Sequence, residues 1–213
     1  MSHVVIIDYG MGNIKSVQRG LEYVSATTTL SSDPKVISNA DYLVLPGVGA
    51  FEDGMKGLKN MGLVEALHRF KSKGNPLLGI CLGMQMLLDF SEENGIHQGL
   101  GIIQGSVKAI PQKEGGKLRR KTPHIGWSEL RYAKGLKTWK GSCLSNTAPG
   151  KSFYFVHSFM ALPEDSRNIL AQCDYEGILI TAAVQKENVT GLQFHPEKSG
   201  KNGLQILQSF INK

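Results

Sequence analysis

PLLGICLGMQMLL, residues 76–88, is the most informative stretch of this chain for its fold. The apolar run that ends at Ile80 is typical of a buried strand, and the run over residues 84–88 is typical of a helix. Between them lies Cys81, with Gly79 before it and Gly83 after it. Because glycine has no Cβ, the backbone beside Cys81 can bend sharply and a substrate can approach it. The stretch therefore predicts a nucleophile elbow, a reactive side chain on a tight turn between a strand and a helix.

Cysteine stands here where many hydrolases carry serine. The thiolate is the reactive form of cysteine, and a helix N-terminus favours it through partial positive charge and unpaired N–H groups. The competing interpretation is a buried cysteine that packs as a small hydrophobic side chain. Residues elsewhere in the chain must decide between the two.

A cysteine nucleophile needs a histidine to accept its proton, and that histidine needs a third group to orient it. Of the six histidines, His195 stands out because it begins His195-Pro196-Glu197. Pro196 favours an extended conformation at His195, and residues i and i+2 of an extended segment point to the same side. Glu197 can then bond one imidazole nitrogen while the other faces the thiol. A polar loop end after the expected strand at 189–194 is the alternative, but together with the elbow the pattern favours a triad of Cys81, His195 and Glu197.

On the N-terminal side of the elbow, short apolar runs alternate with helical spacing. Strands are expected at 4–7, 27–30, 42–45 and 77–80. Helices are expected through 14–24, from 33, around 55–60 and over 63–73. This alternation predicts an α/β fold with a central, mostly parallel sheet flanked by helices.

The second half of the chain is richer in strands. They are expected near 106–110, 153–156, 169–173, 178–184 and 189–194, before an amphipathic helix through Leu204, Leu207 and Phe210. The chain has 213 residues and shows no clear linker. One domain spanning residues 1–213 is therefore expected.

Three loops are expected to meet at one edge of the sheet. Residues 8–13, residues 46–49 and the Cys81 turn each follow an expected strand. In such a sheet these loops lie at the carboxyl edge, where ligands bind. Residues 46–49, Pro-Gly-Val-Gly, supply flexible backbone whose N–H groups can point into a site there. Taken alone, the same residues are equally an ordinary glycine-rich turn.

Composition argues against several functions. No run approaches the about 18 apolar residues of a membrane span, and the N-terminus lacks a signal-peptide pattern. Three cysteines without a C-x-x-C pair argue against a disulfide framework and against a zinc site. A reactive thiol suits a reducing compartment. We therefore expect a cytoplasmic protein without a metal or another cofactor and without membrane association.

Nucleotide and nucleic-acid binding are also disfavoured. The segment Gly10-Met11-Gly12 lacks the third glycine of a dinucleotide fingerprint, and no phosphate-loop pattern occurs. The net charge is +6, and the densest basic stretch runs from Lys113 to Lys121. No nucleic-acid motif accompanies that stretch. It is expected to be a solvated loop or a surface that meets an acidic protein partner.

Six segments, in their order along nearly the whole chain, resemble the class I, or triad-type, glutamine amidotransferases. The closest resemblance is to the glutaminase subunits of imidazole glycerol phosphate synthase. The segments are IDYGMGN (7–13), LPGVGAF (45–51), GICLGMQ (79–85), PHIGW (123–127), YFVHS (154–158) and QFHPEKSG (193–200). The resemblance implies the class I amidotransferase fold and a Cys-His-Glu triad that hydrolyses glutamine.

The resemblance also implies roles for further residues. Backbone N–H groups would form the oxyanion hole at Gly47, Val48, Gly49 and Leu82. The substrate L-glutamine would be held by Gln85, Glu93, His157, Ser158 and Phe159. A carboxylate side chain and backbone donors match the ammonium and carboxylate of that ligand. Taken alone, Gln85 is more often a helix-surface residue and His157 a buried core histidine.

The ammonia released needs an acceptor, and the chain shows no second catalytic site. The resemblance implies a heterodimer with a (β/α)8-barrel cyclase subunit, which makes imidazole glycerol phosphate and AICAR in histidine biosynthesis. The partner contact would include His124, Trp127, Tyr154 and Lys198.

Three alternatives stay open. A paralogous subunit would supply ammonia for sugar amidation in surface-polysaccharide synthesis, and because the partner chooses the acceptor, this chain's residues do not separate the two. A free-standing cysteine hydrolase on the same fold is disfavoured by the His195-Pro196-Glu197 pattern. A binding protein with an inactive site is disfavoured by the intact triad residues.

Overall fold

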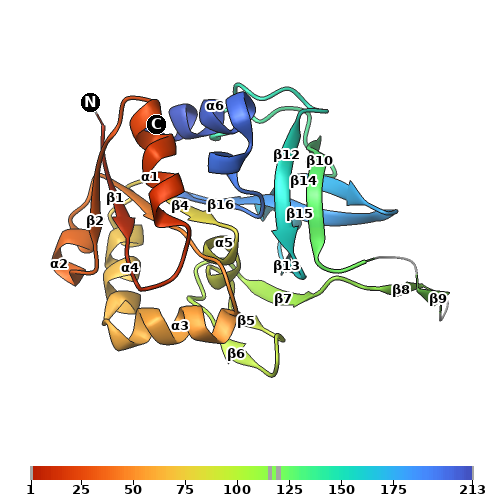
Figure 1. Ribbon diagram of the computed structural model, residues 1–213, viewed down its shortest axis with the longest axis horizontal. Helices are drawn as coiled ribbons and strands as arrows, with labels where there is room; N and C mark the ends of the chain where they lie inside the picture. Colours follow the sequence, from red (N-terminus) through yellow and green to blue (C-terminus); the bar gives the residue numbers. More distant parts are fainter. Residues whose placement is uncertain (1, 115–116, 119–120, 213) are drawn as a thin grey trace.

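Strand β1 (His3–Ile7) is apolar on both sides, and this determines the layering. Val4 and Ile6 belong to one cluster of buried apolar side chains, whereas Val5 and Ile7 belong to another. Such a strand must be covered on both faces. The computed structural model, which describes residues 2–114, 117–118 and 121–212, has helices on both faces of a central sheet (Figure 1).

Within the described residues the central sheet has eight strands. In order across the sheet they are β11 (Arg131–Tyr132), β14 (Ile169–Tyr175), β15 (Ile178–Lys186), β16 (Val189–Leu192), β4 (Leu77–Ile80), β3 (Tyr42–Leu45), β1 and β2 (Thr27–Ser31). Pairing is parallel from β16 to β2 and antiparallel from β11 to β16. The expected α/β fold is confirmed, and the antiparallel extension accounts for much of the strand-rich second half.

Two helical layers cover the parallel part of the sheet. On one face lie α1 (Ile14–Tyr23) and α6 (Gly200–Ile211); on the other lie α2 (Pro34–Ser38), α3 (Phe51–Asn60) and α4 (Leu63–Ser72) (Figure 1). The helix after the elbow is α5 (Leu82–Met86). None of the helices in the described ranges is long and apolar enough to cross a membrane.

Smaller sheets complete the described structure. A two-stranded sheet pairs β10 (His124–Glu129) with β12 (Ser152–His157). A four-stranded sheet has the order β13 (Phe159–Pro163), β7 (Gly105–Ala109), β5 (Phe90–Ser91) and β6 (His97–Gln98). Sequence patterning missed β10 and β13: β10 contains Gly126, β13 ends at Pro163, and each is stabilised by pairing with a strand distant in the chain.

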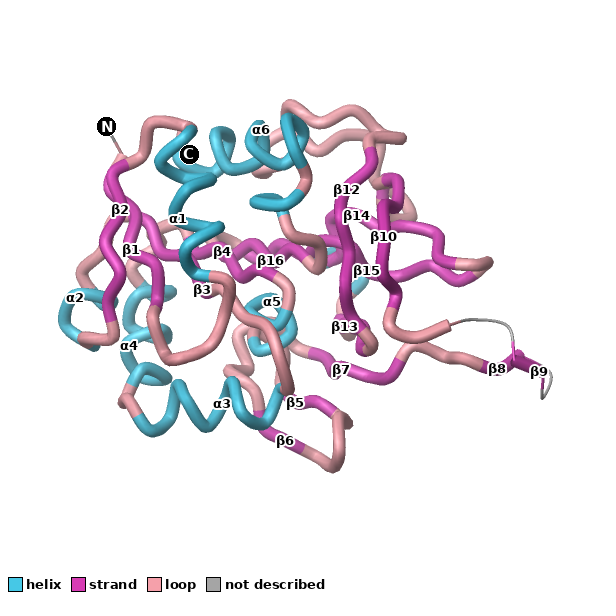
Figure 2. The backbone as a smooth tube through the Cα atoms, viewed as in Figure 1, coloured by secondary structure: helices cyan, strands magenta, loops and turns pink. Residues whose placement is uncertain are grey.

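The basic stretch forms part of a hairpin that extends from the body. Its strands are β8 (Lys113–Glu114) and β9 (Lys117–Leu118), at the far right of the backbone trace in Figure 2. Arg119 and Arg120, which belong to the predicted basic stretch, lie outside the described residues.

Two expected helix boundaries were wrong. The helix after the elbow begins at Leu82, immediately after Cys81, and not at residue 84. Helix α3 begins at Phe51 and not near residue 55. The Phe51 N–H donates to Glu93 Oε2 at 2.7 Å, so a carboxylate 42 residues away satisfies one of the first N–H groups of the helix.

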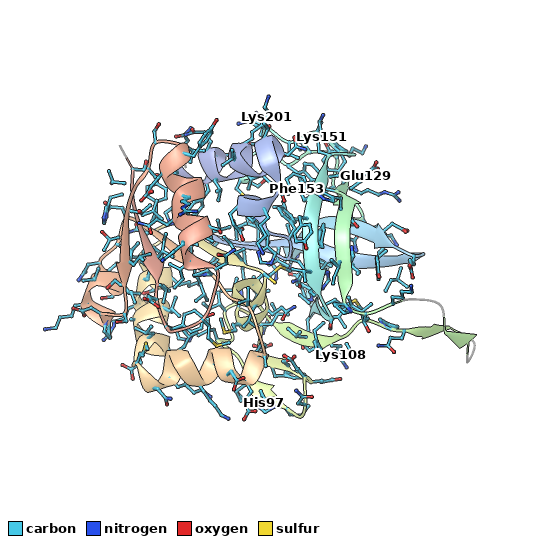
Figure 3. The ribbon with its side chains drawn as sticks, in the orientation of Figure 1. His97, Lys108, Glu129, Lys151, Phe153 and Lys201 are labelled. Atoms are coloured by element: carbon cyan, nitrogen blue, oxygen red, sulfur yellow. The ribbon has the colours of Figure 1, made fainter. Side chains whose placement is uncertain are left out.

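Strand β12 supports the segment that follows β16. Phe153, labelled in Figure 3, is fully buried, and its ring centroid lies 4.6 Å from that of Phe194. The His195 N–H donates to the Tyr154 carbonyl at 2.9 Å, and the Ser199 hydroxyl accepts from the Tyr154 N–H at 3.0 Å. These contacts place His195 at the carboxyl edge of the sheet, beside the elbow.

Candidate active site

Cys81 occupies a strained turn between β4 and α5. Its φ is 54° and its ψ is −110°, a region that residues with a Cβ adopt only at a cost in free energy. The Cys81 N–H donates to the Leu192 carbonyl at 2.7 Å, which holds the turn against β16. The strand–turn–helix pattern expected around Cys81 is confirmed, and the side chain lies at the N-terminus of α5, largely buried.

The glycine after the turn is required by a close backbone approach. A Cβ built on Gly83 would lie 1.9 Å from the Leu45 carbonyl oxygen, so α5 can pack this tightly against β3 only with glycine there. This contact positions the elbow next to the loop at residues 46–49.

His195 and Glu197 form a buried hydrogen-bonded pair. The backbone at His195 is extended, with φ −98° and ψ 97°, and its Nδ1 lies 2.8 Å from Glu197 Oε1. Among the described residues neither His195 Nε2 nor Glu197 Oε2 has a hydrogen-bond partner, although both are buried. Burial favours the neutral imidazole, but Cys81 and Glu197 outweigh it and raise the pKa of His195 to about 9. The site therefore favours the protonated imidazolium of His195 beside Cys81.

A cavity of about 260 Å³ opens over Cys81 and His195. It is lined by Val48, Gly49, Cys81, Leu82, Gln85, Glu93, Pro123, Val156, His157, Ser158, Phe159 and His195. Most of the residues predicted from the sequence to act on glutamine are thus brought to one cavity. Glu197, which is hydrogen-bonded to His195, and Gly47, which is close to Leu82, are not among the lining residues. Pro123 and Val156 were not singled out from the sequence.

The two predicted sides of the oxyanion hole do not converge in this structure. The Leu82 N–H donates to the Gly47 carbonyl at 3.3 Å. The Gly47–Val48 peptide is trans, so the Val48 N–H points away from Leu82. Gly47 itself is closely surrounded: a Cβ there would lie 2.8 Å from the Tyr9 hydroxyl and 2.9 Å from Leu82 Cβ.

Gln85 is buried, so its alternative interpretation as a surface residue is wrong. Its Nε2 donates to the Phe159 carbonyl and to Gln193 Oε1, both at 3.0 Å. Gln193 in turn donates from Nε2 to Cys81 Sγ at 3.8 Å. Sequence reasoning missed Gln193 as a site residue. A polar side chain directly after an apolar strand and two residues before His195 was the available signal.

His157 lines the cavity and is also a hydrogen-bonded buried histidine. Its Nδ1 lies 2.8 Å from the Phe159 carbonyl, and its Nε2 lies 3.0 Å from His124 Nδ1. Because a carbonyl only accepts, His157 Nδ1 carries the proton and Nε2 accepts from His124. His124 Nε2 then accepts from the Ser128 hydroxyl, 2.9 Å away. Burial lowers the pKa of His124 to about 4 and that of His157 to about 3, so both rings are neutral near pH 7.

The residues predicted at the partner contact separate into exposed and buried. Trp127 on β10 is 59% exposed, its ring lies 6.1 Å from that of Tyr154, and Lys198 Nζ lies 6.0 Å from the Tyr154 ring centroid. His124, the first residue of β10, is only 2% exposed in the isolated chain and stacks on Phe155 and on Tyr175, so its place in the partner contact stays a prediction. Ile125, 59% exposed beside Trp127, was missed.

Within the described part of the chain, no group of three or more His, Cys, Asp and Glu side chains is arranged to hold a metal ion.

Comparison with known proteins identifies relatives along the whole chain. The family model described as glutamine amidotransferase class-I matches residues 5–213. Imidazole glycerol phosphate synthase subunit HisH 1 of Legionella pneumophila (strain Lens) is 49% identical over 211 residues, covering 99% of each chain. The HisH subunit of Aquifex aeolicus is 45% identical, covering 98% of this chain and 96% of its own.

Solved structures share the fold at much lower identity. PurLQS from Thermotoga maritima superposes with a TM-score of 0.71 at 18% identity, covering 99% of this chain and 98% of that chain. A glutamine amidotransferase from the same organism has a TM-score of 0.61 at 18% identity, covering 94% of this chain and 78% of its own.

Proposed function

The chain belongs to the class I glutamine amidotransferase family, and we propose that it hydrolyses glutamine at Cys81 and passes the ammonia to a cyclase partner. Relatives of 44–49% identity that match nearly its full length are glutaminase subunits of imidazole glycerol phosphate synthase. The chain is accordingly a glutamine-hydrolysing subunit of that synthase, in histidine biosynthesis. The surface-polysaccharide paralogue and the free-standing hydrolase are not favoured.

The observation that carries the proposed mechanism is the buried His195–Glu197 pair beside Cys81 in one cavity. The thiolate of Cys81 attacks the side-chain carbonyl carbon of glutamine, and a C–S bond forms. The imidazolium of His195 gives its proton to the leaving nitrogen as the C–N bond breaks and ammonia departs. Water, deprotonated by His195, then attacks the thioester and releases glutamate and the thiol. Glu197 orients the ring and stabilises its positive charge in each step.

Glutamine is proposed to lie in the 260 Å³ cavity. Glu93 supplies a carboxylate for the ammonium group, although its Oε2 also accepts from the Phe51 N–H. Ser158 and the neighbouring backbone supply donors for the α-carboxylate, and Phe159 and His157 contribute the wall.

The oxyanion hole is proposed to be closed in the isolated chain. The Leu82 N–H donates to the Gly47 carbonyl at 3.3 Å, and the Val48 N–H points away from Leu82. Neither N–H group is therefore available to a substrate oxygen. Rotation of the Gly47–Val48 peptide would free the Leu82 N–H and turn the Val48 N–H towards the substrate oxygen. Flanking glycines permit that rotation at low strain. One missing oxyanion donor costs about 10²–10³ in rate, which is large enough for a switch.

The partner is proposed to be a (β/α)8-barrel cyclase subunit that forms a heterodimer with this chain. Trp127 and Lys198, both exposed, form an aromatic and cationic group with the half-buried Tyr154. Aromatic side chains are enriched where interfaces gain most binding free energy. Because ammonia that escapes becomes protonated and unreactive, the receiving site must be close. We further propose that residues 1–213 act as one amidotransferase domain and that the complex is cytoplasmic.

The test of this function is Cys81→Ala in the complex with the cyclase subunit. We expect glutamine-dependent synthesis to fall by about a thousandfold or more, because the nucleophile is lost. Synthesis with added ammonium salt should stay near the wild-type rate, because the cyclase is untouched. Glutamine hydrolysis near the wild-type rate in Cys81→Ala would show that another group is the nucleophile.

A further inference from the structure

Gln193 follows β16, is fully buried, and contacts both Gln85 and Cys81, which line the cavity. Its Nε2 donates to Cys81 Sγ at 3.8 Å, and its Oε1 accepts from Gln85 Nε2 at 3.0 Å. Gln193 thus contacts the reacting sulfur, and nothing in the proposed mechanism uses it.

The direction of the Gln193 amide is determined by its neighbours. An amide oxygen and nitrogen have the same shape, so the hydrogen-bond network decides which one faces the sulfur. The Phe159 carbonyl can only accept, so the group of Gln85 that lies 3.0 Å from it must be the NH₂. The second hydrogen of that NH₂ goes to Gln193, which must accept it with Oε1. The NH₂ of Gln193 therefore faces Cys81.

The Phe159 carbonyl is itself held in place. His157 Nδ1 donates to it at 2.8 Å, so both of its lone pairs are used. His157 is held in that tautomer because its Nε2 accepts from His124, which is bonded to Ser128. A series of hydrogen bonds thus runs from β10, through one backbone carbonyl, to the sulfur of the nucleophile.

We propose that Gln193 is a positioning residue for glutamine hydrolysis, whose side-chain amide donates a hydrogen bond to Cys81 and stabilises the thiolate. The inference rests on the proposed function, because it assigns Cys81 as the nucleophile. A hydrogen bond to the charged form of an acid favours that form. The NH₂ of an amide has no free lone pair to accept a proton, so Gln193 supports the thiolate without competing with His195 as a base.

The test compares Gln193→Met and Gln193→Glu with the wild-type chain. Methionine keeps the length of the side chain without its donor, and glutamate keeps its shape but presents a carboxylate to the sulfur. The measurement is the rate of Cys81 alkylation by iodoacetamide as a function of pH, read from the mass of the peptide that carries Cys81. We expect the profile to move up by about one pH unit in Gln193→Met, a tenfold loss of thiolate, and further in Gln193→Glu.

Turnover in the complex with the cyclase subunit provides a second readout. We expect kcat for glutamine hydrolysis at pH 7 to fall about tenfold in Gln193→Met with KM changed less than about twofold, since Gln193 contacts the sulfur and is not among the residues that line the cavity. The matched control is Gln185→Met on β15, in the same sheet and outside the cavity. It should leave both the alkylation profile and kcat unchanged.

The inference would be overturned if wild type, Gln193→Met and Gln193→Glu gave overlapping alkylation profiles while thermal denaturation showed that all three are folded. If either substitution prevents folding, Gln85→Met takes its place: it leaves Gln193 present but removes the donor that orients it, and an unmoved profile again overturns the inference. Failure of the proposed function is seen separately, as a wild-type complex without glutaminase activity or a Cys81→Ala complex that retains it.

Discussion

Cys81 is held in a strained backbone conformation, and the imidazole of His195 beside it is held in its protonated form. A non-glycine residue at φ 54° and ψ −110° lies in a sparsely populated backbone region, which costs roughly 1–3 kcal/mol. His195 is buried, yet its pKa is raised to about 9 by Cys81 and Glu197. The surrounding fold offsets the strain at Cys81, and the site holds the nucleophile beside an acid that can protonate the leaving group.

At the same scale, the roles of His195 and Glu197 can be separated by substitution. Glutamine at position 197 can still hydrogen-bond the imidazole, but it stabilises the imidazolium poorly. We therefore expect Glu197→Gln to keep roughly ten to a hundred times the turnover of His195→Ala at saturating glutamine, in the complex. A larger loss in Glu197→Gln than in His195→Ala would mean that Glu197 does more than orient and stabilise the ring.

The buried histidine pair predicts a dependence of stability on pH. His124 and His157 have pKa values lowered to about 4 and about 3, against an ordinary value of 6.5. Below pH 6.5 the unfolded chain takes up these protons and the folded chain does not, so the stability they contribute is present above pH 6.5 and is lost as the pH falls towards 3–4. His195, with its raised pKa, acts in the opposite sense: its contribution is present below 6.5 and lost as the pH rises through about 9.

We expect the free energy of unfolding of the isolated chain to fall between pH 7 and pH 5, with each of the two histidines contributing about 1–2 kcal/mol. Urea denaturation at the two pH values measures this. In His157→Gln the loss between pH 7 and pH 5 should shrink. His68→Gln on the exposed side of α4 is the control and should retain the wild-type loss. Equal losses in His157→Gln and wild type would show that other groups carry the acid sensitivity.

Among the elements, the contact between α5 and β3 determines where the elbow sits. A Cβ at Gly83 would overlap the Leu45 carbonyl at 1.9 Å, and backbone on both sides leaves no flexible group to move. The same close approach places the loop at residues 46–49 beside the N-terminus of α5. Strand β3, helix α5 and the loop at residues 46–49, which carries the predicted oxyanion donors, are therefore positioned as one unit.

Gly83→Ala should consequently destabilise the chain by about 3 kcal/mol or more, because either β3 or α5 must shift. The control is Gly74→Ala, where φ is +82° and no atom lies within 4 Å; only the cost of the left-handed backbone, about 1 kcal/mol, should appear there. Urea denaturation of both variants checks the difference. A Gly83→Ala chain as stable as Gly74→Ala would show that the elements can separate without cost.

For the whole molecule, the exposed side chains on β10 and the closed oxyanion hole at residues 46–49 predict a subunit that hydrolyses glutamine slowly without its partner. The Gly47 carbonyl blocks one donor in the free chain, and a partner opens the hole only if it binds the open form more tightly. We expect glutaminase activity to be lowest in the isolated chain, higher in its complex with the cyclase, and highest when the complex also holds the acceptor ligand. Equal rates under the three conditions would show that the oxyanion site is preformed.

Trp127→Ala should weaken binding to the cyclase by about tenfold or more, since exposed tryptophans often anchor interfaces. The activity of the chain without its partner should not change. Tyr23→Ala on α1 is the matched control, because Tyr23 is an exposed aromatic residue, at 77%, outside the predicted contact. Isothermal titration calorimetry of each variant with the cyclase measures the change in affinity. Wild-type affinity in Trp127→Ala would show that Trp127 does not anchor the contact with the cyclase.

Local patterns in the chain were enough to predict the alternation of strands and helices, the elbow at Cys81 and the pairing of His195 with Glu197. Each depends on a short-range rule: apolar period, glycine at a turn, and the i, i+2 geometry of an extended segment. The places of Gln193 and His124, the start of α3 and the closed state of the Gly47–Val48 peptide emerged only once the chain was folded. These depend on hydrogen bonds between residues 33 to 112 positions apart, and no local pattern in the chain records which distant donor meets which acceptor.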